Sequence, residues 1–217
     1  MALIAAQVLD RASVILNDTG NISYPREELL DWLNDARRVM ASIRTDLYAV
    51  VEDVELAAGA RQGLPADGYR LIDVTYNDDG TPITLVRRET MGLLGLGVAN
   101  AASTRVKHYM FDERSPRAFR VWPPAAAGTV VEMVYARLPE PVTLEGTLLE
   151  SEELYSALLV DYVVARAYMK DTEFVANQQR AAAHLDHFMS VLGSGRERDF
   201  SASPNSNEGG QPSRAGQ

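Results

Sequence analysis

The chain has 217 residues, no cysteine and a formal net charge of −9 at pH 7. This length is sufficient for one large domain or two small ones with a hydrophobic core. Because cysteine is absent, disulfides, thiolate nucleophiles and zinc–thiolate sites are excluded. The excess of acidic residues argues against a surface that grips nucleic-acid phosphate, although an acidic wall would suit a channel through which DNA slides without sticking.

The N-terminal segment does not have the pattern of a signal peptide, since it lacks a basic region and its apolar run ends at Asp10 and Arg11. No uninterrupted apolar run approaches the ~18 residues that a membrane span needs. We therefore expect a protein that is made and folds in the cytoplasm and has no membrane partner.

Two helices are predicted within residues 1–48. Apolar residues recur three and four positions apart over residues 3–17, which is the pattern of an amphipathic helix. Ser23 is the predicted N-cap of the second helix, with Pro25 in its first turn. The apolar face of this second helix comprises Leu29, Leu33, Ala36, Met40, Ile43 and Leu47. The two helices are expected to form a hairpin.

Residues 49–141 are predicted to form an inserted antiparallel β-sandwich or barrel module. Alternating apolar and acidic residues from Val50 to Leu56 indicate a half-exposed strand. Residues 59–63 and 77–80 are predicted turns, and residues 123–128 a predicted loop. Further strands are predicted at residues 69–76, 83–87, 105–111, 119–122 and 129–135. Short strands separated by turns at this spacing are typical of all-β modules.

Residues 142–193 return to a helical period and are predicted to form a second helical hairpin. Ser151 is expected to open its first helix, which is broken after Lys170. The second helix is predicted from about Glu173 to Leu192 and is expected to end at Gly193, because glycine is a suitable C-cap.

Residues 194–217 are rich in Ser, Gly, Pro, Asn and Gln, and Phe200 is their only large apolar residue. We expect this tail to be extended and disordered when alone, since it cannot bury enough surface to offset its ordering entropy. Neither helical hairpin can easily bury its own apolar face. We therefore predict an α+β fold in which both hairpins form one four-helix bundle with the β module inserted between them.

One pair of histidines has the spacing of a possible metal site. His184 and His187, with Asp186 between them, lie three positions apart and share one helix face. A zinc site needs at least a third ligand, so two polar residues on a solvated helix face are the preferred interpretation.

Three other groupings also have a simpler explanation than chemistry. Glycines 92, 95 and 97 lack the lysine and Ser/Thr of a phosphate loop. The acidic residues at 150, 152 and 153 suit the first turn of a helix, and the mixed charges of residues 112–117 suit a solvated hairpin tip, although a partner could bind there. We therefore predict no catalytic residue, no cofactor and no metal site.

Five segments, taken in order, resemble the head-to-tail adaptor family of short-tailed bacteriophages, also called connector or tail tubular protein A-like proteins. The resemblance covers residues 3–192 and depends on the order and spacing of the five segments. They are Val8–Asp18, Tyr24–Arg38, Gly59–Val74, His108–Pro124 and Val134–Pro139.

The resemblance implies a structural virion protein and no enzyme. Twelve copies would form a ring between the portal and the tail nozzle, and double-stranded DNA would pass through the ring without specific binding during ejection. Assembly would take place in the host cytoplasm. The C-terminal segment would dock into the portal through Arg196, Arg198 and Phe200, with Phe200 as the anchor.

The glycine-rich apolar run near residue 95 would suit a surface that becomes buried between neighbouring subunits. Its candidate contact residues are Leu93, Leu94, Leu96 and Val98.

Three alternatives remain open on the residues alone. The first is another neck or tail-completion protein of the virion. The second is a small cytoplasmic enzyme or ligand-binding domain with a pocket between bundle and sheet, and the third is an acidic regulator of a basic partner.

Overall fold

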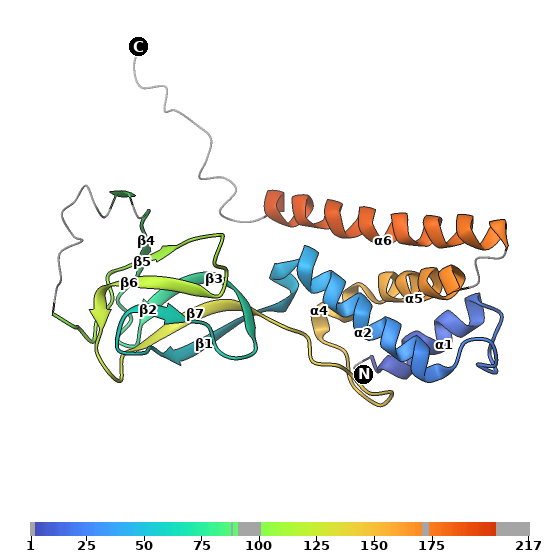
Figure 1. Ribbon diagram of the computed structural model, residues 1–217, viewed down its shortest axis with the longest axis horizontal. Helices are drawn as coiled ribbons and strands as arrows, with labels where there is room; N and C mark the ends of the chain where they lie inside the picture. Colours follow the sequence, from blue (N-terminus) through green and yellow to red (C-terminus); the bar gives the residue numbers. More distant parts are fainter. Residues whose placement is uncertain (1–2, 88, 91–100, 171–173, 203–217) are drawn as a thin grey trace, which may run out of the picture. The chain divides into compact units, whose positions relative to one another are not determined.

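The computed structural model describes residues 3–87, 89–90, 101–170 and 174–202, and side chains as far as residue 195 (Figure 1). The chain divides into two compact units. One unit is helical and combines Met1–Arg44 with Glu140–Gln217, whereas the other comprises Thr45–Pro139 and contains both β-sheets.

The helical unit is organised around one central helix (Figure 1). α5 packs against α1, α2 and α6, and it can do so because it is apolar on several sides. Its buried residues are Leu158, Leu159, Val160, Tyr162, Val163, Val164, Ala165 and Ala167. The helices are α1 (Ala5–Ile15), α2 (Arg26–Ile43), α4 (Glu150–Leu154), α5 (Ser156–Lys170) and α6 (Val175–Ala202).

The predicted four-helix bundle is wrong, although the α+β class agrees with the structure. Among the described residues the helical unit has five helices, because the helix expected from Ser151 is two helices, α4 and α5, that meet at Tyr155. A bundle of two hairpins requires one apolar stripe on each helix. α5 instead buries successive residues and acts as a core that the other helices share.

The start of α2 differs from the prediction. The N-cap is Pro25 and not Ser23, because Ser23 belongs to a turn that the Asp18 carboxylate organises. This carboxylate accepts hydrogen bonds of 2.9 Å from the main-chain N–H groups of Ile22, Ser23 and Tyr24. Asp18 therefore holds the turn that precedes α2, and the N-cap residue of the helix provides no side-chain cap.

The end of the last helix also differs from the prediction. α6 continues past Gly193 to Ala202, so residues 194–202 are helical and not part of an extended, disordered tail. Residues 203–217 lie outside the described part of the chain. The glycine at 195 has a packing role: an added Cβ would lie 2.5 Å from Nη1 of the buried Arg44.

The β unit consists of two sheets that share one core (Figure 1). The strand orders are β1-β7-β3 and β2-β6-β5-β4. All pairings are antiparallel except that of β4 with β5, which is parallel and corrects the expectation of a purely antiparallel module. The strands are β1 (Ala49–Glu55), β2 (Gly59–Gly63), β3 (Gly68–Asn77), β4 (Thr84–Leu85), β5 (His108–Phe111), β6 (Ala118–Ala125) and β7 (Val130–Arg137).

Two predicted connections are strands. Residues 59–63 were expected to be a turn but form β2, which pairs with β6. β6 itself extends to Ala125, through the prolines that suggested a loop from residue 123. Both errors have the same origin, since glycine and proline indicate turns locally whereas pairing with a partner strand keeps these segments extended.

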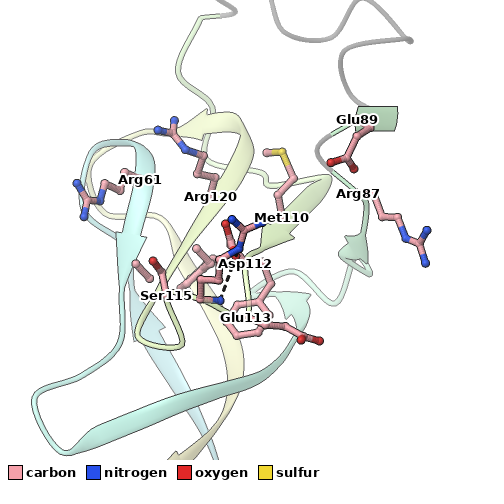
Figure 2. A pocket seen from close by; sticks show the side chains of 12 residues that line it. Arg61, Arg87, Glu89, Met110, Asp112, Glu113, Ser115 and Arg120 are labelled. Atoms are coloured by element: carbon pink, nitrogen blue, oxygen red, sulfur yellow. Dashed lines mark hydrogen bonds and ion pairs between the residues drawn. The ribbon is translucent and has the colours of Figure 1, made fainter.

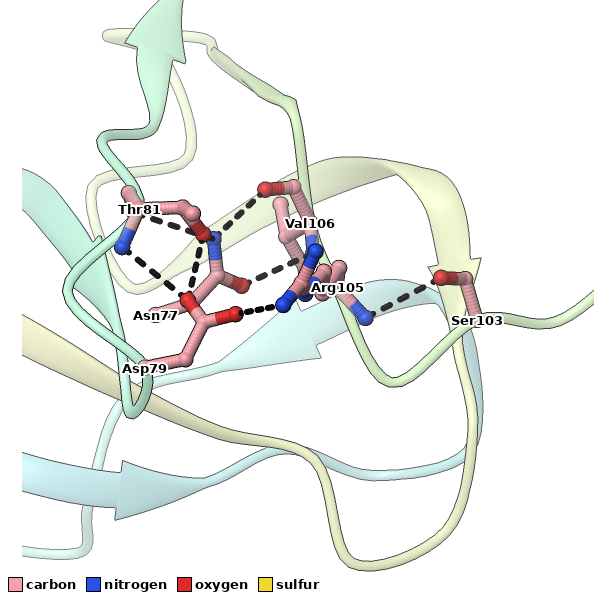
Figure 3. Close-up of polar contacts among 6 residues, drawn as sticks. All are labelled: Asn77, Asp79, Thr81, Ser103, Arg105 and Val106. Atoms are coloured by element: carbon pink, nitrogen blue, oxygen red, sulfur yellow. Dashed lines mark hydrogen bonds and ion pairs between the residues drawn. The ribbon is translucent and has the colours of Figure 1, made fainter.

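A buried asparagine fixes the base of the long connection between β4 and β5 (Figure 3). Asn77, 3% exposed, donates to the carbonyl of Val106 and accepts from the main-chain N–H of Val106, both at 2.8 Å. The same side chain donates to the carbonyl and hydroxyl oxygens of Thr81. Nearby, Asp79 forms an ion pair of 2.5 Å with Arg105. Two segments on either side of the connection are thereby held together.

Candidate functional site

A concave pocket of about 580 Å³ lies on the β unit and is lined by four arginines and three carboxylates (Figure 2). Arg61 and Arg120 lie on one side of it, and Arg87 and Glu89 on the other. The lining residues are Arg61, Arg87, Glu89, Met110, Phe111, Asp112, Glu113, Arg114, Ser115, Ala118, Phe119 and Arg120. The mixed-charge segment 112–117, for which a solvated hairpin tip was preferred, therefore contributes residues to a concave surface.

The strand register places two of these arginines directly opposite each other. Arg61 of β2 is the cross-strand partner of Arg120 of β6. Their neighbours Gln62 and Phe119 are buried, so both arginines point to the outer face of the four-stranded sheet. No ion pair joins either arginine to a carboxylate of the described residues. Like charges at opposite positions destabilise a sheet, which makes this pair a candidate for binding an anionic group.

An aromatic side chain extends the same outer face. Met110 of β5 lies opposite Arg120, and Trp122 lies two residues further along β6. The Trp122 ring stacks on His108, with ring centroids 5.7 Å apart, and Lys107 Nζ lies 5.9 Å from the centroid of that ring. We call Arg61, Lys107, Met110, Arg120 and Trp122 the basic face. Arginine and tryptophan are the residue types that most often dominate protein interfaces.

The two histidines of the possible metal site contact a neighbouring helix. Nδ1 of His184 and Nδ1 of His187 each lie 2.7 Å from a carboxylate oxygen of Asp161 on α5. His187 is exposed and His184 partly exposed, in keeping with a solvated helix face. Both rings nevertheless also join α6 to α5 through Asp161. Within the described residues, no group of three or more His, Cys, Asp or Glu residues is placed to hold a metal ion.

One of the predicted first-turn carboxylates has a second role. Glu152 is fully buried, and its Oε1 accepts a 2.7 Å hydrogen bond from Nε of Arg37, which is also buried. Its Oε2 accepts from the main-chain N–H of Leu149 at 3.0 Å. The prediction that Glu152 lies in the first turn of a helix is correct. Its buried partner Arg37 lies on α2, 115 residues away in sequence.

The residues proposed for docking and for subunit contacts are only partly described. Arg196, Arg198 and Phe200 lie in the last part of α6, where the backbone is helical. The loop residues Leu93, Leu94, Leu96 and Val98 lie outside the described residues. None of the helices in the described part of the chain is both long and apolar enough to span a bilayer.

Comparison with protein families agrees with the resemblance seen in the sequence. The model of the SU10 adaptor protein family matches residues 4–208, which include nearly all of both units. This confirms the resemblance to phage head-to-tail adaptors, a family of structural proteins of the virion. No curated protein matches the chain. Since the family match extends over nearly the whole sequence, the chain belongs to the SU10 adaptor protein family.

Proposed function

We propose that this chain forms a ring that joins the portal to the tail nozzle of a short-tailed bacteriophage. The observation that carries the proposal is the adaptor-family match across both units. The ring forms part of the channel through which double-stranded DNA leaves the head, and the protein folds in the host cytoplasm before it joins the virion. We infer twelve copies from the resemblance to head-to-tail adaptors.

The charge of the chain supports a channel that DNA crosses without binding. The formal net charge is −9, and most of the acidic excess belongs to the helical unit. A negative wall repels phosphate and therefore opposes the retention of DNA by nonspecific contacts. This expectation concerns the channel as a whole and does not require a specific DNA-binding residue.

The C-terminal end of α6 is the proposed portal-docking element. Arg196, Arg198 and Phe200 belong to a 28-residue helix, which corresponds to a length of about 42 Å. Docking would therefore use the end of a helix and the residues after it. A short apolar anchor between charged residues can bind weakly in each subunit and still hold firmly when the copies of a ring bind together.

The proposed subunit contact through Leu93, Leu94, Leu96 and Val98 has a simple test. Replacement of Leu94 by aspartate places a charge in a surface that would become apolar and buried on assembly. We expect this substitution to reduce ring formation while the circular dichroism spectrum of the chain stays unchanged. Normal ring yield would remove this loop from the interface.

Electron microscopy of the purified protein with the portal of the same phage tests the function. We expect a ring of additional density on one end of the portal, whose symmetry gives the number of copies. Bare portals beside free protein would contradict the adaptor proposal, and a ring that binds only to another neck component would favour a tail-completion role.

Two variants separate docking from folding in this experiment. A chain that ends after Ala202 keeps α6, and a full-length chain with Arg196, Arg198 and Phe200 changed to alanine loses the proposed contacts. If these three residues carry docking, the triple variant binds portal poorly and the truncated chain retains binding. The opposite result would assign docking to residues 203–217.

A further inference from the structure

The outer face of the three-stranded sheet carries a charge pattern opposite to that of the basic face. Asp53 of β1 is the direct cross-strand partner of Glu132 of β7. Glu132 accepts a hydrogen bond from the hydroxyl of Thr75, whereas no described residue forms a hydrogen bond or ion pair with the side chain of Asp53. Two carboxylates at opposite positions repel each other, so this pair is also electrostatically unfavourable in the isolated chain.

Exposed apolar side chains flank the two carboxylates. Val51 lies two residues before Asp53 on β1 and is 60% exposed, and Tyr76 of β3 lies opposite Glu132 and is 47% exposed. We call Val51, Asp53, Tyr76 and Glu132 the acidic face. Large apolar side chains that remain exposed beside unpaired charges are typical of a surface that a partner covers.

The two faces lie on opposite sides of the β unit. Residues such as Met133 of β7 and Val121 of β6 point from the two sheets into one common core. Side chains alternate along a strand, so Glu132 and Arg120 point away from that core. Each sheet therefore presents its outer face in the direction opposite to that of the other sheet.

We propose that the acidic face of one copy binds the basic face of the next copy. The inference rests on the ring assembly proposed above and identifies the surfaces through which neighbouring subunits meet. A contact between two different patches on opposite sides of the same chain is heterologous, and such contacts generate closed rings when the rotation between copies closes. The carboxylate pair Asp53–Glu132 of one copy then faces the arginine pair Arg61–Arg120 of the next copy, and the opposite charges neutralise each other.

The composition of the basic face favours a polypeptide over nucleic acid as the partner. Glu89, Asp112 and Glu113 line the same pocket as the arginines and would repel a continuous phosphate backbone. Met110 and Trp122 offer apolar area that the exposed Val51 and Tyr76 of another copy can cover. A second copy supplies both the carboxylates and the apolar side chains.

Single charge reversals test the contact without endangering the fold. Asp53→Arg and Arg120→Glu each convert a like-charge cross-strand pair into an attractive one, so the monomer should be at least as stable as the unmodified chain. We expect each variant to lower the yield of rings on portal by about tenfold or more, because like charges then face each other between copies. Arg38→Glu, an exposed reversal on the helical unit, should assemble normally.

Reversal of the charges of both pairs in one chain should restore the contact between copies. A chain with arginine at 53 and 132 and glutamate at 61 and 120 has the two faces inverted and again complementary, so its rings should return. Unimpaired rings from the single variants, or no recovery by the fourfold variant when circular dichroism shows that it is folded, would overturn the inference.

Cross-linking then identifies the partner directly. Because the chain has no cysteine, Asp53→Cys and Arg120→Cys in one chain introduce the only thiols. A short bis-maleimide added to rings on portal should yield a ladder of covalent multimers, whereas either cysteine alone should not.

The outcomes separate the inference from the proposed function. Products with portal, nozzle or DNA, or no product from an intact ring, would overturn the inference and leave the adaptor function standing. Failure of the unmodified chain to form a ring on portal would instead contradict the proposed function itself, and the inference with it.

Discussion

The buried ion pair between Arg37 and Glu152 leads to a quantitative prediction for the helical unit. The side chain of Arg37 is 4% exposed and that of Glu152 is fully buried. Replacement of Glu152 by methionine keeps most of the volume but leaves a buried guanidinium without its counter-charge. Loss of one member of such a pair costs about 3–5 kcal/mol, a large part of the roughly 5–15 kcal/mol that stabilises a domain.

The neighbours of Arg37 set the expectation for the double variant. Arg37 Nη1 also donates to the main-chain oxygen of Glu140, so replacement of both residues by methionine leaves this carbonyl without its donor. This hydrogen bond is partly buried, and loss of its donor costs at most about 1–3 kcal/mol. We expect each single variant to lose about 3–5 kcal/mol and the double variant only about 1–3 kcal/mol, which is strong non-additivity.

Urea unfolding followed at 222 nm and by tryptophan fluorescence measures these free energies. The two tryptophans of the chain lie one in each unit, so a Trp122→Phe background makes the emission of the buried Trp32 report on the helical unit alone. Additive effects, or single variants that lose less than about 1 kcal/mol, would refute a tightly coupled buried pair.

Three further predictions concern single side chains. Asn77→Ala should lower the free energy of unfolding by at least about 2 kcal/mol in urea titrations, because the buried main-chain N–H and C=O of Val106 lose their partner. An effect below about 0.5 kcal/mol would contradict this role of Asn77. Gly195→Ala should destabilise the chain by about 1–3 kcal/mol, because the added Cβ would clash with Arg44. Gly193→Ala should instead stabilise the chain by about 0.5–1 kcal/mol, because nothing lies within 4 Å of its added Cβ. Equal effects of the two substitutions in thermal melts would contradict this packing. The Asp18 carboxylate accepts hydrogen bonds from main-chain N–H groups, among which that of Tyr24 has the largest effect, and these bonds lower the pKa of the carboxyl group. The ionised carboxylate therefore stabilises the fold fully above its unfolded pKa of about 3.9. This contribution is lost as the pH falls through the lower folded pKa. The difference in melting temperature between the unmodified chain and Asp18→Asn should therefore be present at pH 7 and shrink in acid, and a difference independent of pH would contradict this role.

The local periodicity of the sequence predicted much of the secondary structure. The spacing of apolar residues along α2 and the alternation along β1 were sufficient to identify these elements, and strands were also predicted where β3 and β7 lie. This is possible because the side-chain period of a helix or strand depends on neighbouring residues only. The order of five segments also identified the adaptor family, which the match to residues 4–208 confirms.

The arrangement of these elements depended on contacts between residues far apart in the chain. The apolar period of α5 did not indicate that it would be the shared core of the helical unit. Gly193 suggested a helix end, whereas the helix continues and Gly195 leaves space for Arg44. The pairing of Arg61 with Arg120 and of Asp53 with Glu132 depends on strand register, which the sequence of one strand does not contain. The sequence by itself thus determined the elements and the family, whereas only the tertiary structure decided which charges meet, since register and packing join residues that are distant in sequence.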